Sequence, residues 1–342
     1  MRMENGWFWK SMLFQDGRHL HQLQESISQE KYLFMQTNPE ETMFELELSR
    51  QIHAACIWEV TARKVGNVHP LASFRNLHFT DFILSAGAIA PILSKTRKLG
   101  LANAIFESVK TTKTSVGTNT NLGIILLFAP VAFANNRADL KKEIQKAIAD
   151  ISIEETKIIY DAIRLASPGG MGKEPQADIN DVPTCTVLEA MRLAQDRDLI
   201  AKQYADGYSA IFNDAIPTLG GSLEQLGCME GAIIFTHLYL MGKYPDSLIL
   251  RKCGPNDAKE SSERAKKVLE KQWPLKESGW TEFKEFDRWL RMEGNKRNPG
   301  ATADLIAVTL FIALRLGQIS LPLTFPWSDG IENALRRTAP DF

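Results

Sequence analysis

The chain has 342 residues, 44% of them hydrophobic and 24% charged, which is an ordinary globular composition with enough length for a large buried core. Its formal net charge of −1 gives no electrostatic reason to expect nucleic acid or an anionic membrane as a partner. The longest apolar runs, residues 123–134 and 305–314, are too short to span a bilayer and predict buried helices. We therefore expect a globular protein without a nucleic-acid or membrane partner.

Cysteine usage and the N-terminus predict a cytoplasmic protein. The four cysteines, Cys56, Cys185, Cys228 and Cys253, are scattered without a C-x-x-C pair, so they are expected to be reduced. Residues 1–31 lack the apolar stretch of a secretory signal. The six histidines form no H-E-x-x-H motif, which argues against a histidine-ligated zinc site.

Almost every segment shows the 3.6-residue periodicity of helices, and the alternation typical of strands is absent. We expect helices over residues 38–63, 79–93, 101–111, 122–134, 137–149, 153–166, 184–195, 199–213, 223–241, 258–272, 281–292 and 301–316. The first is opened by a capping asparagine and a proline in its first turn. The helices over residues 137–149 and 153–166 are expected to form a hairpin.

The fold class predicted by these elements is all-α, a single-domain helical bundle with long polar loops between helices. Residues 64–77 and 167–183 are the longest of these loops. Residues 1–36 are expected to form an N-terminal arm, which precedes one domain over residues 37–342.

A short polar loop, residues 117–123, leads directly into an apolar run. Its hydroxyl and amide side chains, Thr118, Asn119, Thr120 and Asn121, would meet the free N–H groups of a starting helix, an arrangement that suits phosphate. Alternatively, these residues only cap the helix. No Walker or G-x-G-x-x-G spacing is present, so the standard nucleotide-binding folds are not supported.

Two irregular stretches also carry groups suited to a charged substrate. Residues 64–76, together with Asp81, offer cations, amides and one acid, although a solvated loop between helices would look the same. Residues 167–181 hold glycines, a lysine and nearby acids, which would suit a mobile cover over phosphates with Mg²⁺ bound by oxygen ligands. A disordered surface loop is the alternative for this second stretch.

Two helix starts nearer the C-terminus complete the set of candidates. Asp246 stands within two helical turns of the pair Arg251 and Lys252, a pattern that an N-cap followed by a basic last turn would also explain. Asp304 lies near the start of an apolar helix, either as a surface residue matched to the helix dipole or as an inward-facing ligand.

In their order along the chain, these motifs resemble those of the triphosphoribosyl-dephospho-CoA synthase family. Residues 117–123 fit its Gly-x-Asn-Thr-His-Lys-Gly motif, and residues 64–68 and 73–77 fit its Lys-x-Gly-x-Val and Ser-His-Arg-Asp-Met motifs. Residues 246–254 are similar to its Asp-Thr-Asn-x-x-x-Arg-x-Gly segment, and residues 298–307 to its Ser-Pro-Gly-Gly-x-Ala-Asp-Leu-Leu-Ala segment. The resemblance implies an all-α fold.

The chain departs from the family pattern at five of these positions. Asn121 and Leu122 replace the family's His-Lys pair, Phe74 and Asn76 replace its histidine and aspartate, and Leu248 replaces an asparagine. A cation, an imidazole and a carboxylate are thereby lost. The resemblance is therefore to a divergent member of the family.

The resemblance, which covers residues 45–317, implies a transferase that moves the triphosphoribosyl group of ATP to the 2′-hydroxyl of 3′-dephospho-CoA and releases adenine. Such a reaction needs an anion cradle, a carboxylate near the anomeric carbon and Mg²⁺ on the triphosphate. The candidate catalytic residues are Asp81, Asp246 and Asp304, and the last two are also the candidate metal ligands. The candidate phosphate- and substrate-binding residues are Lys64, Asn67, Arg75, Gly117, Thr118, Asn119, Thr120, Asn121, Gly123, Arg251 and Lys252.

Two other functions stay open at this point. The lost His-Lys pair also fits a related all-α transferase or phosphohydrolase that acts on another phosphorylated ribose, or on a pterin-type intermediate of one-carbon cofactor biosynthesis. A non-catalytic nucleotide-binding or assembly protein is the third interpretation, although the retained acids argue against it. The expected partners are ATP and a phosphorylated nucleotide or coenzyme acceptor, and the sequence leaves a homo-oligomer open.

Overall fold

The computed structural model describes residues 38–135, 138–169, 172, 174 and 176–322. Contacts between Cα atoms divide the chain into two compact units, Met1–Leu46 and Glu47–Phe342. The described part of the first unit is only the beginning of helix α2, so the sites discussed below all belong to the second unit. The predicted arm over residues 1–36 lies outside the described residues, and the domain boundary placed after it stays a prediction.

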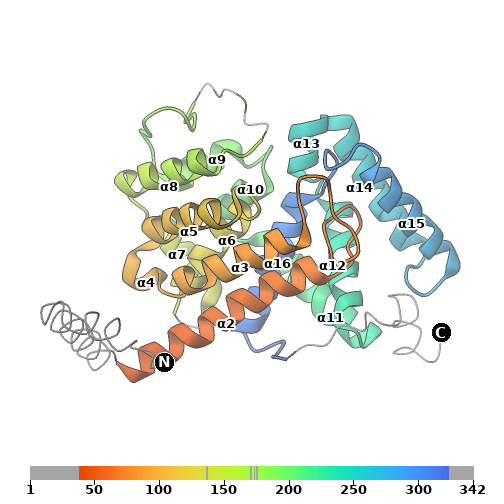
Figure 1. Ribbon diagram of the computed structural model, residues 1–342, viewed down its shortest axis with the longest axis horizontal. Helices are drawn as coiled ribbons and strands as arrows, with labels where there is room; N and C mark the ends of the chain where they lie inside the picture. The colour runs from red at the N-terminus through yellow and green to blue at the C-terminus, as the bar shows by residue number, and fades with distance from the viewer. Residues whose placement is uncertain (1–37, 136–137, 170–171, 173, 175, 323–342) are drawn as a thin grey trace, which may run out of the picture. The chain divides into compact units, whose positions relative to one another are not determined.

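The described residues form helices and no β-strand, which confirms the predicted all-α fold (Figure 1). The elements are α2 (Pro39–Thr61), α3 (Phe79–Leu93), α4 (Thr96–Leu99), α5 (Leu101–Val116), α6 (Leu122–Phe133), α7 (Leu140–Ala149), α8 (Ile153–Ala166), α9 (Val187–Ala194), α10 (Leu199–Asp206), the π-helix η1 (Ile211–Ala215), α11 (Ile216–Leu226), α12 (Met229–Lys243), α13 (Ser247–Cys253), α14 (Pro255–Glu270), α15 (Glu277–Arg291) and α16 (Gly300–Arg315).

Two of the predicted helices are wrong, because a glycine interrupts each of them. The helix expected over residues 223–241 is divided at Gly227, which has a φ of 59° and ends α11. The helix expected over residues 199–213 ends before Gly207, which has a φ of 68°, and the separate element η1 follows. Glycine adopts this left-handed conformation without a Cβ clash, so it can end a helix within a continuous periodic pattern.

The predicted hairpin of residues 137–149 and 153–166 is also wrong, because α8 packs along α5 and not along α7. Helix α5 is longer than expected and ends at Val116 rather than near residue 111. It packs against α3 and α6 as well as α8. The loop that follows α5 therefore starts from a helix held by several neighbouring helices.

Helices α6 and α16 form the buried centre of this unit (Figure 1). The rings of Phe128 in α6 and Phe311 in α16 pack with centroids 4.7 Å apart. Pro130 lies inside α6 and has no N–H for the carbonyl of Leu126, one turn earlier. The Tyr204 hydroxyl donates to that carbonyl at 2.7 Å. A phenol thus replaces the missing helical bond and allows a proline in a buried helix.

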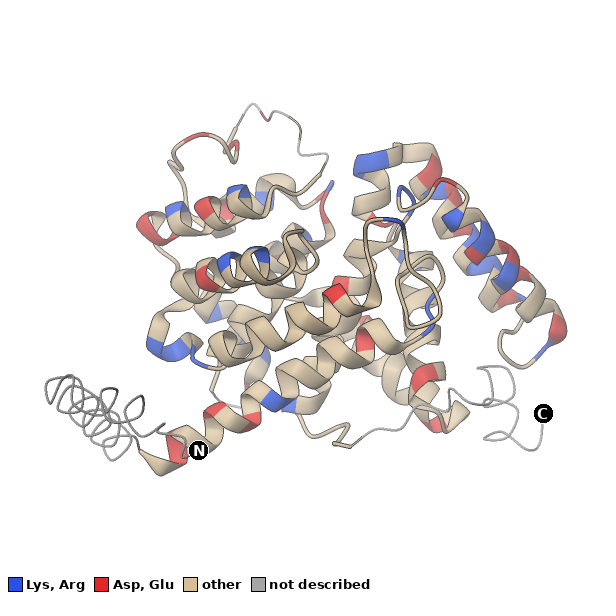
Figure 2. Cartoon of the chain, in the orientation of Figure 1, with Lys and Arg blue, Asp and Glu red and all other residues tan. Residues whose placement is uncertain are grey.

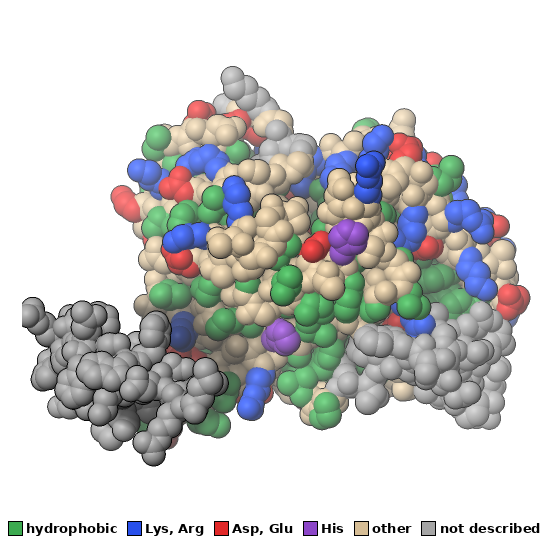
Figure 3. Space-filling view, viewed as in Figure 1, with side chains coloured by type: hydrophobic (Ala, Val, Ile, Leu, Met, Phe, Trp, Pro, Cys, Tyr) green, Lys and Arg blue, Asp and Glu red, His purple; other side chains and the backbone are tan. Residues whose placement is uncertain are grey.

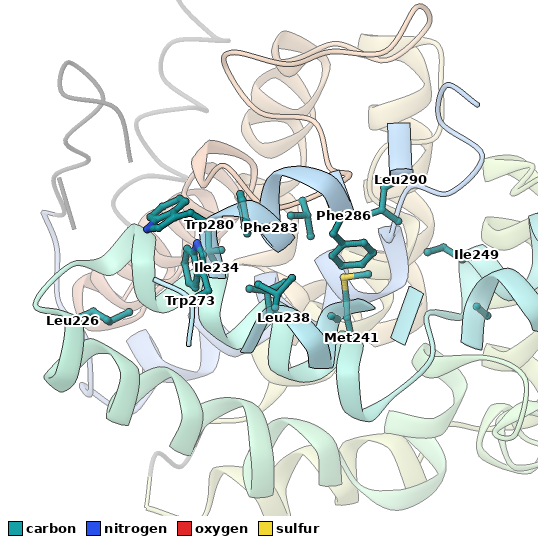
Figure 4. Packing of buried hydrophobic residues seen from close by; sticks show 14 of the residues in the cluster. Leu226, Ile234, Leu238, Met241, Ile249, Trp273, Trp280, Phe283, Phe286 and Leu290 are labelled. Carbon is teal, nitrogen blue, oxygen red and sulfur yellow. The ribbon is translucent and has the colours of Figure 1, made fainter. Parts of the chain in front are cut away.

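A second core lies among α12, α14 and α15 (Figure 4). The ring centroid of Trp273 lies 5.4 Å from that of Trp280 and 5.3 Å from that of Phe283. Ile249 of α13 belongs to the same cluster of buried residues. The aromatic core therefore also fixes the short helix α13, whose basic last turn borders the site described below.

Charged side chains of both signs are interspersed along the described helices (Figure 2), for example over the length of α14. The face drawn in Figure 3 shows the same mixture of signs rather than one large patch of a single sign. Among the described helices, none combines the length and hydrophobicity that a membrane span requires.

Candidate active site

A cavity of about 910 Å³ is lined by the N-terminal turns of α6, α13 and α16. Residues from the loop after α2, from α5, α8, α9 and α10, and from the described part of the stretch 167–179 also line it. The volume lies at the upper end of the range for small-molecule sites, so the cavity has room for a large ligand. The three helices belong to motifs that are far apart in the chain.

Most of the residues singled out in the sequence line this cavity. The residues in its wall are Asn67, Gly117, Thr118, Asn119, Thr120, Asn121, Gly123, Arg251, Lys252 and Asp304. Four others, Lys64, Arg75, Asp81 and Asp246, do not line it. The motifs therefore do form one cluster in space, but their residues have different parts in it.

The loop of residues 117–121 is both a helix cap and a part of the cavity wall. The Leu122 N–H donates to Asn119 Oδ1 at 3.1 Å, and the hydroxyls of Thr120 and Ser85 share a hydrogen bond. Asn121 is only 4% exposed, and its Nδ2 has no hydrogen-bond partner among the described residues. The capping alternative thus accounts for Asn119, whereas Asn121 keeps an unsatisfied amide in the cavity wall.

Gly123 leaves the space in which the Asp304 carboxyl lies. A Cβ at Gly123 would lie well inside van der Waals distance of Asp304 Oδ2, so any side chain here would displace the acid. The Asp304 carboxyl forms no hydrogen bond or ion pair with the described residues. Burial raises the pKa of Asp304 well above its ordinary value, and the nearby acids Glu59, Asp246 and Asp198 add to the shift. Asp304 therefore keeps its proton to a higher pH than an ordinary carboxyl group.

Asp246 joins two helices and does not face the cavity. Its Oδ1 accepts from the N–H groups of Leu248 and Ile249 at 2.8 and 3.0 Å and so caps α13. Its Oδ2 accepts from the N–H and the hydroxyl of Thr302 in α16 at 2.7 and 2.8 Å. With four bonds made, Asp246 holds the basic turn of α13 beside the helix that carries Asp304.

Arg251 and Lys252 bring positive charge to the cavity. Arg251 Nη1 lies 3.2 Å from Asp198 Oδ2, and Arg251 Nε donates to the Gly169 carbonyl at 3.0 Å. Partial burial, together with the adjacent Arg251, lowers the pKa of Lys252. Asp198 also lines the cavity and caps α10, but it was not predicted. Its position directly before an apolar helical run is the N-cap signal that would have found it.

Lys64 is buried behind the cavity wall and neutralises Glu59. It is 0% exposed, and its Nζ lies 2.9 Å from Glu59 Oε1 and also donates to the carbonyls of Glu59 and Ala62. Glu59 lines the cavity. Burial raises the pKa of Glu59, and the Lys64 ammonium opposes this shift. Glu59 was not predicted, because a single acid in the last turn of an apolar helix carries no distinctive signal.

Asp81 and Arg75 lie away from the cavity, whereas Asn67 from the same region lines it. Asp81 Oδ2 accepts from the His78 N–H at 2.7 Å at the start of α3. Arg75 is exposed. Asn67 Nδ2 donates to Asn298 Oδ1 at 2.8 Å, and Asn67 Oδ1 has no partner among the described residues. Of these three candidates, only Asn67 is placed to meet a ligand.

The stretch after α8 borders the cavity and is tied to α8 by hydrogen bonds. The Tyr160 hydroxyl donates to the Ala177 carbonyl at 3.0 Å, and Arg164 donates to the Ile179 carbonyl. The buried Asp178 carboxylate accepts from the N–H groups of residues 174 and 180 at 2.6 and 2.8 Å. Asp178 therefore shapes this stretch, and the lysine at position 173 lies outside the described residues.

Four of the five departures from the family pattern change the cavity wall. Asn76, Asn121, Leu122 and Leu248 all line the cavity. Phe74 does not, because it is buried beneath the Arg291 guanidinium, whose carbon lies 5.5 Å from the ring centroid. The wall therefore carries amides and leucines where the family pattern has an imidazole, a cation, a carboxylate and an amide.

The described residues contain no ready-made metal cage. No group of three or more His, Cys, Asp or Glu side chains within those residues is placed to hold an ion. The two oxygens of Asp246 already accept four hydrogen bonds. Mg²⁺ on a triphosphate needs only one or two protein carboxylates. Of the two predicted ligands, only Asp304 lines the cavity.

The chain is similar to known proteins in both sequence and fold. The pattern of the CitG family, described as ATP:dephospho-CoA triphosphoribosyl transferase, matches residues 45–320. None of the curated proteins compared with the chain matches it. A crystal structure named "putative triphosphoribosyl-dephospho-coA synthase from Archaeoglobus fulgidus" has a similar fold, with a TM-score of 0.52 and 22% identity over 68% of this chain and 98% of that chain. The family match confirms the predicted resemblance. The chain belongs to the ATP:dephospho-CoA triphosphoribosyl transferase family and is an enzyme that transfers a triphosphoribosyl group.

Proposed function

We propose that the chain transfers the triphosphoribosyl group of ATP to the 2′-hydroxyl of 3′-dephospho-CoA and releases adenine. The observation that supports this most is the convergence of the five family motif segments on one cavity, with the Asp304 carboxyl unpartnered in its wall. ATP and the coenzyme precursor are then the two small-molecule partners. A cytoplasmic location, where ATP is available, is part of the same proposal.

In this proposal, Asp304 protonates the adenine as it leaves. The reaction breaks the C1′–N9 bond, and negative charge develops on the purine while the ribose gains oxocarbenium character. A carboxyl group whose pKa is raised by burial can supply the proton at a higher pH than an ordinary carboxyl group can. We therefore expect kcat to fall as the pH rises past the raised pKa of Asp304, where this group loses its proton.

The triphosphate is bound at the starts of α6 and α16, whose helix dipoles attract anions, although Asn119 and Asp246 already accept from the Leu122 and Thr302 N–H groups. The Asn121 amide, the Arg251 guanidinium and the Lys252 ammonium add donors and positive charge in the same cavity wall. Mg²⁺ enters with ATP as a part of the substrate. Because Asp304 serves as a proton donor, it does not bind the metal ion.

Three of the four candidates outside the cavity wall have supporting parts. Asp246 is a positioning residue that holds α13 against α16. Lys64 neutralises Glu59, and Asp81 caps α3. Arg75 is exposed and has no part in this proposal.

Adenine release from ATP in the presence of 3′-dephospho-CoA tests the proposal. The Asp304→Asn variant should lose roughly 10²–10⁴-fold in kcat, the range that general acid–base groups contribute. Asp81→Asn is the matched control, since it makes the same chemical change outside the cavity, and it should keep the wild-type kcat. Full activity of Asp304→Asn would contradict the assignment.

The acceptor is tested separately with the wild-type enzyme. Adenine should appear only when both ATP and 3′-dephospho-CoA are present. No adenine release, but activity on another phosphorylated ribose or a pterin-type compound, would favour the related transferase or phosphohydrolase. Nucleotide binding without any turnover would favour the non-catalytic protein. The formation of a homo-oligomer stays a prediction.

A further inference from the structure

Glu59 is a charged residue of the cavity wall for which the assignments above leave no part. It lies in the last turn of α2, is 4% exposed, and lines the cavity. Its Oε1 lies 2.9 Å from Lys64 Nζ, and no other described group bonds to its carboxylate. The second oxygen is therefore left for a ligand.

The Glu59–Lys64 pair is not explained by stability. Burial of two charges costs desolvation energy, and apolar residues of similar volume often replace such pairs without loss. The hydrogen bonds of Lys64 Nζ go only to Glu59 and to the backbone carbonyls of Glu59 and Ala62, all in one short segment. A buried lysine that bonds so locally holds one carboxylate in one place and balances its charge.

The other titratable groups near this pair come from α2, α12, α16 and the loop after α2, where His69 lies near Lys64, Arg63 and Arg291. Asp304 lines the same cavity, and the buried thiol of Cys56 lies near both acids. His237 of α12 is fully buried near Lys64, and neither ring nitrogen has a partner among the described residues. Burial, with a smaller contribution from Lys64, lowers the pKa of His237 well below its ordinary value, so it is neutral. Glu59 is paired with Lys64, whereas Asp304 has no ion-pair partner among the described residues.

We propose that Glu59 is the general base of the transfer and accepts the proton of the acceptor hydroxyl, the counterpart of Asp304 as the acid. The inference rests on the proposed function. The acceptor oxygen bonds to C1′ of the ribose while the C1′–N9 bond breaks, and the electron pair of that bond goes to adenine. The acceptor proton passes to Glu59, and adenine takes a proton from Asp304. Proton exchange through solvent from Glu59 to Asp304 then restores the enzyme.

The Glu59→Gln variant tests this role in the full chain. We expect kcat for adenine release to fall roughly 10²–10⁴-fold, whereas the Kd for ATP, measured by calorimetry, stays at the wild-type value. The wild-type kcat should fall at acid pH, where Glu59 takes up a proton. Glu59→Gln should lose this acid limb of the pH profile, a change that a purely structural role would not produce.

A second variant is needed because Glu59→Gln alone leaves Lys64 buried without an anion. The double variant Glu59→Gln/Lys64→Met removes both charges and keeps the volume close to native. It should fold with a Tm near that of the wild type, bind ATP and lack turnover. The matched control is Arg63→Met/Glu230→Gln, which removes the neighbouring buried pair outside the cavity and should keep the wild-type kcat.

The outcomes separate this inference from the proposed function. Full turnover in either Glu59 variant, while the wild type releases adenine, overturns the role of Glu59 alone. The same follows if the double variant loses ATP binding in proportion to turnover, or if Glu59→Gln keeps the acid limb. No adenine from the wild type overturns the proposed function, and the role of Glu59 falls with it.

Discussion

Two buried ion pairs start from adjacent residues directly after α2, and they are built differently. Arg63 Nε and Nη2 each donate to a different oxygen of Glu230 at 2.7 Å, and the Arg63 N–H donates to Glu230 Oε1 at 3.1 Å. Lys64 meets Glu59 at one oxygen, at 2.9 Å. The first pair joins the end of α2 to α12, whereas the second lies within one short segment.

The difference in bonding distinguishes a carboxylate with a structural role, Glu230, from one available for the reaction, Glu59. Glu230 has both oxygens bonded, does not line the cavity, and links segments 167 residues apart, so it contributes to the stability of the fold. Glu59 keeps an oxygen for a ligand and lines the cavity. A buried carboxylate whose two oxygens are both hydrogen-bonded therefore indicates a structural role. A carboxylate beside a cavity with one oxygen unbonded indicates a role in function.

The largest effect is expected from Arg63→Met. This substitution leaves the Glu230 carboxylate buried without its partner, which should cost about 3–5 kcal/mol of unfolding free energy. Urea denaturation measures the loss, and kcat of the folded fraction should not change. If the loss of unfolding free energy were no larger than for a substitution at an exposed residue, the two ion pairs would not differ in structural role.

The dependence of stability on pH should distinguish the unpartnered Asp304 carboxyl from the fully bonded Glu230. The raised pKa of Asp304 means that the native state keeps a proton that the unfolded chain releases above the ordinary carboxyl pKa. Wild-type stability should therefore fall with rising pH in this window, by up to about 1.4 kcal/mol per pH unit, and level off above the native pKa. Asp304→Asn should lack this contribution to the slope. Denaturation curves over a pH series check it, and equal slopes would contradict the assignment.

The third prediction concerns Lys64→Met, which removes the cation beside Glu59. The pKa of Glu59, already raised by burial, should rise further, because Lys64 is the group that opposes the shift. The acid limb of kcat should move to higher pH, with about a tenfold lower rate on that limb for each unit of pKa. Arg63→Met should leave the limb in place, and an equal shift in both variants would show that the two pairs do not differ in function.

The smallest effect is expected at a third carboxylate, Asp246, which is fully bonded like Glu230. Thr302→Val removes one of its four hydrogen bonds and should cost about 1 kcal/mol of stability. The Tm should fall slightly and the Km for ATP should stay unchanged, because the backbone N–H of Thr302 still holds Asp246. A large loss of turnover would mean that Asp246 takes part in the chemistry itself.

Local patterns predicted much of the fold. The boundaries of α8 were correct because Ser152 and Glu155 form a capping box before an amphipathic run. The apolar run of α6 was correctly predicted as buried. The breaks at Gly207 and Gly227 could not be predicted, since a periodic pattern does not reveal which glycine takes a left-handed conformation.

The candidate site was predictable as a set of segments and not as a set of roles. The order of the motifs predicted which loops and helix starts gather at the cavity. The direction of each side chain depends on how the helices pack. Lys64 was therefore assigned to phosphate although it lies buried behind Glu59, and Asp246 was assigned to metal although it bonds α13 to α16. Glu59 itself became recognisable only when its neighbours in space were known.

The missing side chain at Gly123 offers a way to arrest the enzyme. One added methyl group would push the Asp304 carboxyl out of its place. The groups proposed to hold the phosphates, at the starts of α6 and α16 and on the last turn of α13, would keep their positions. A Gly123→Ala chain would then hold ATP and the acceptor side by side without converting them. Such a stalled complex is the form in which a crystal would show both substrates at once.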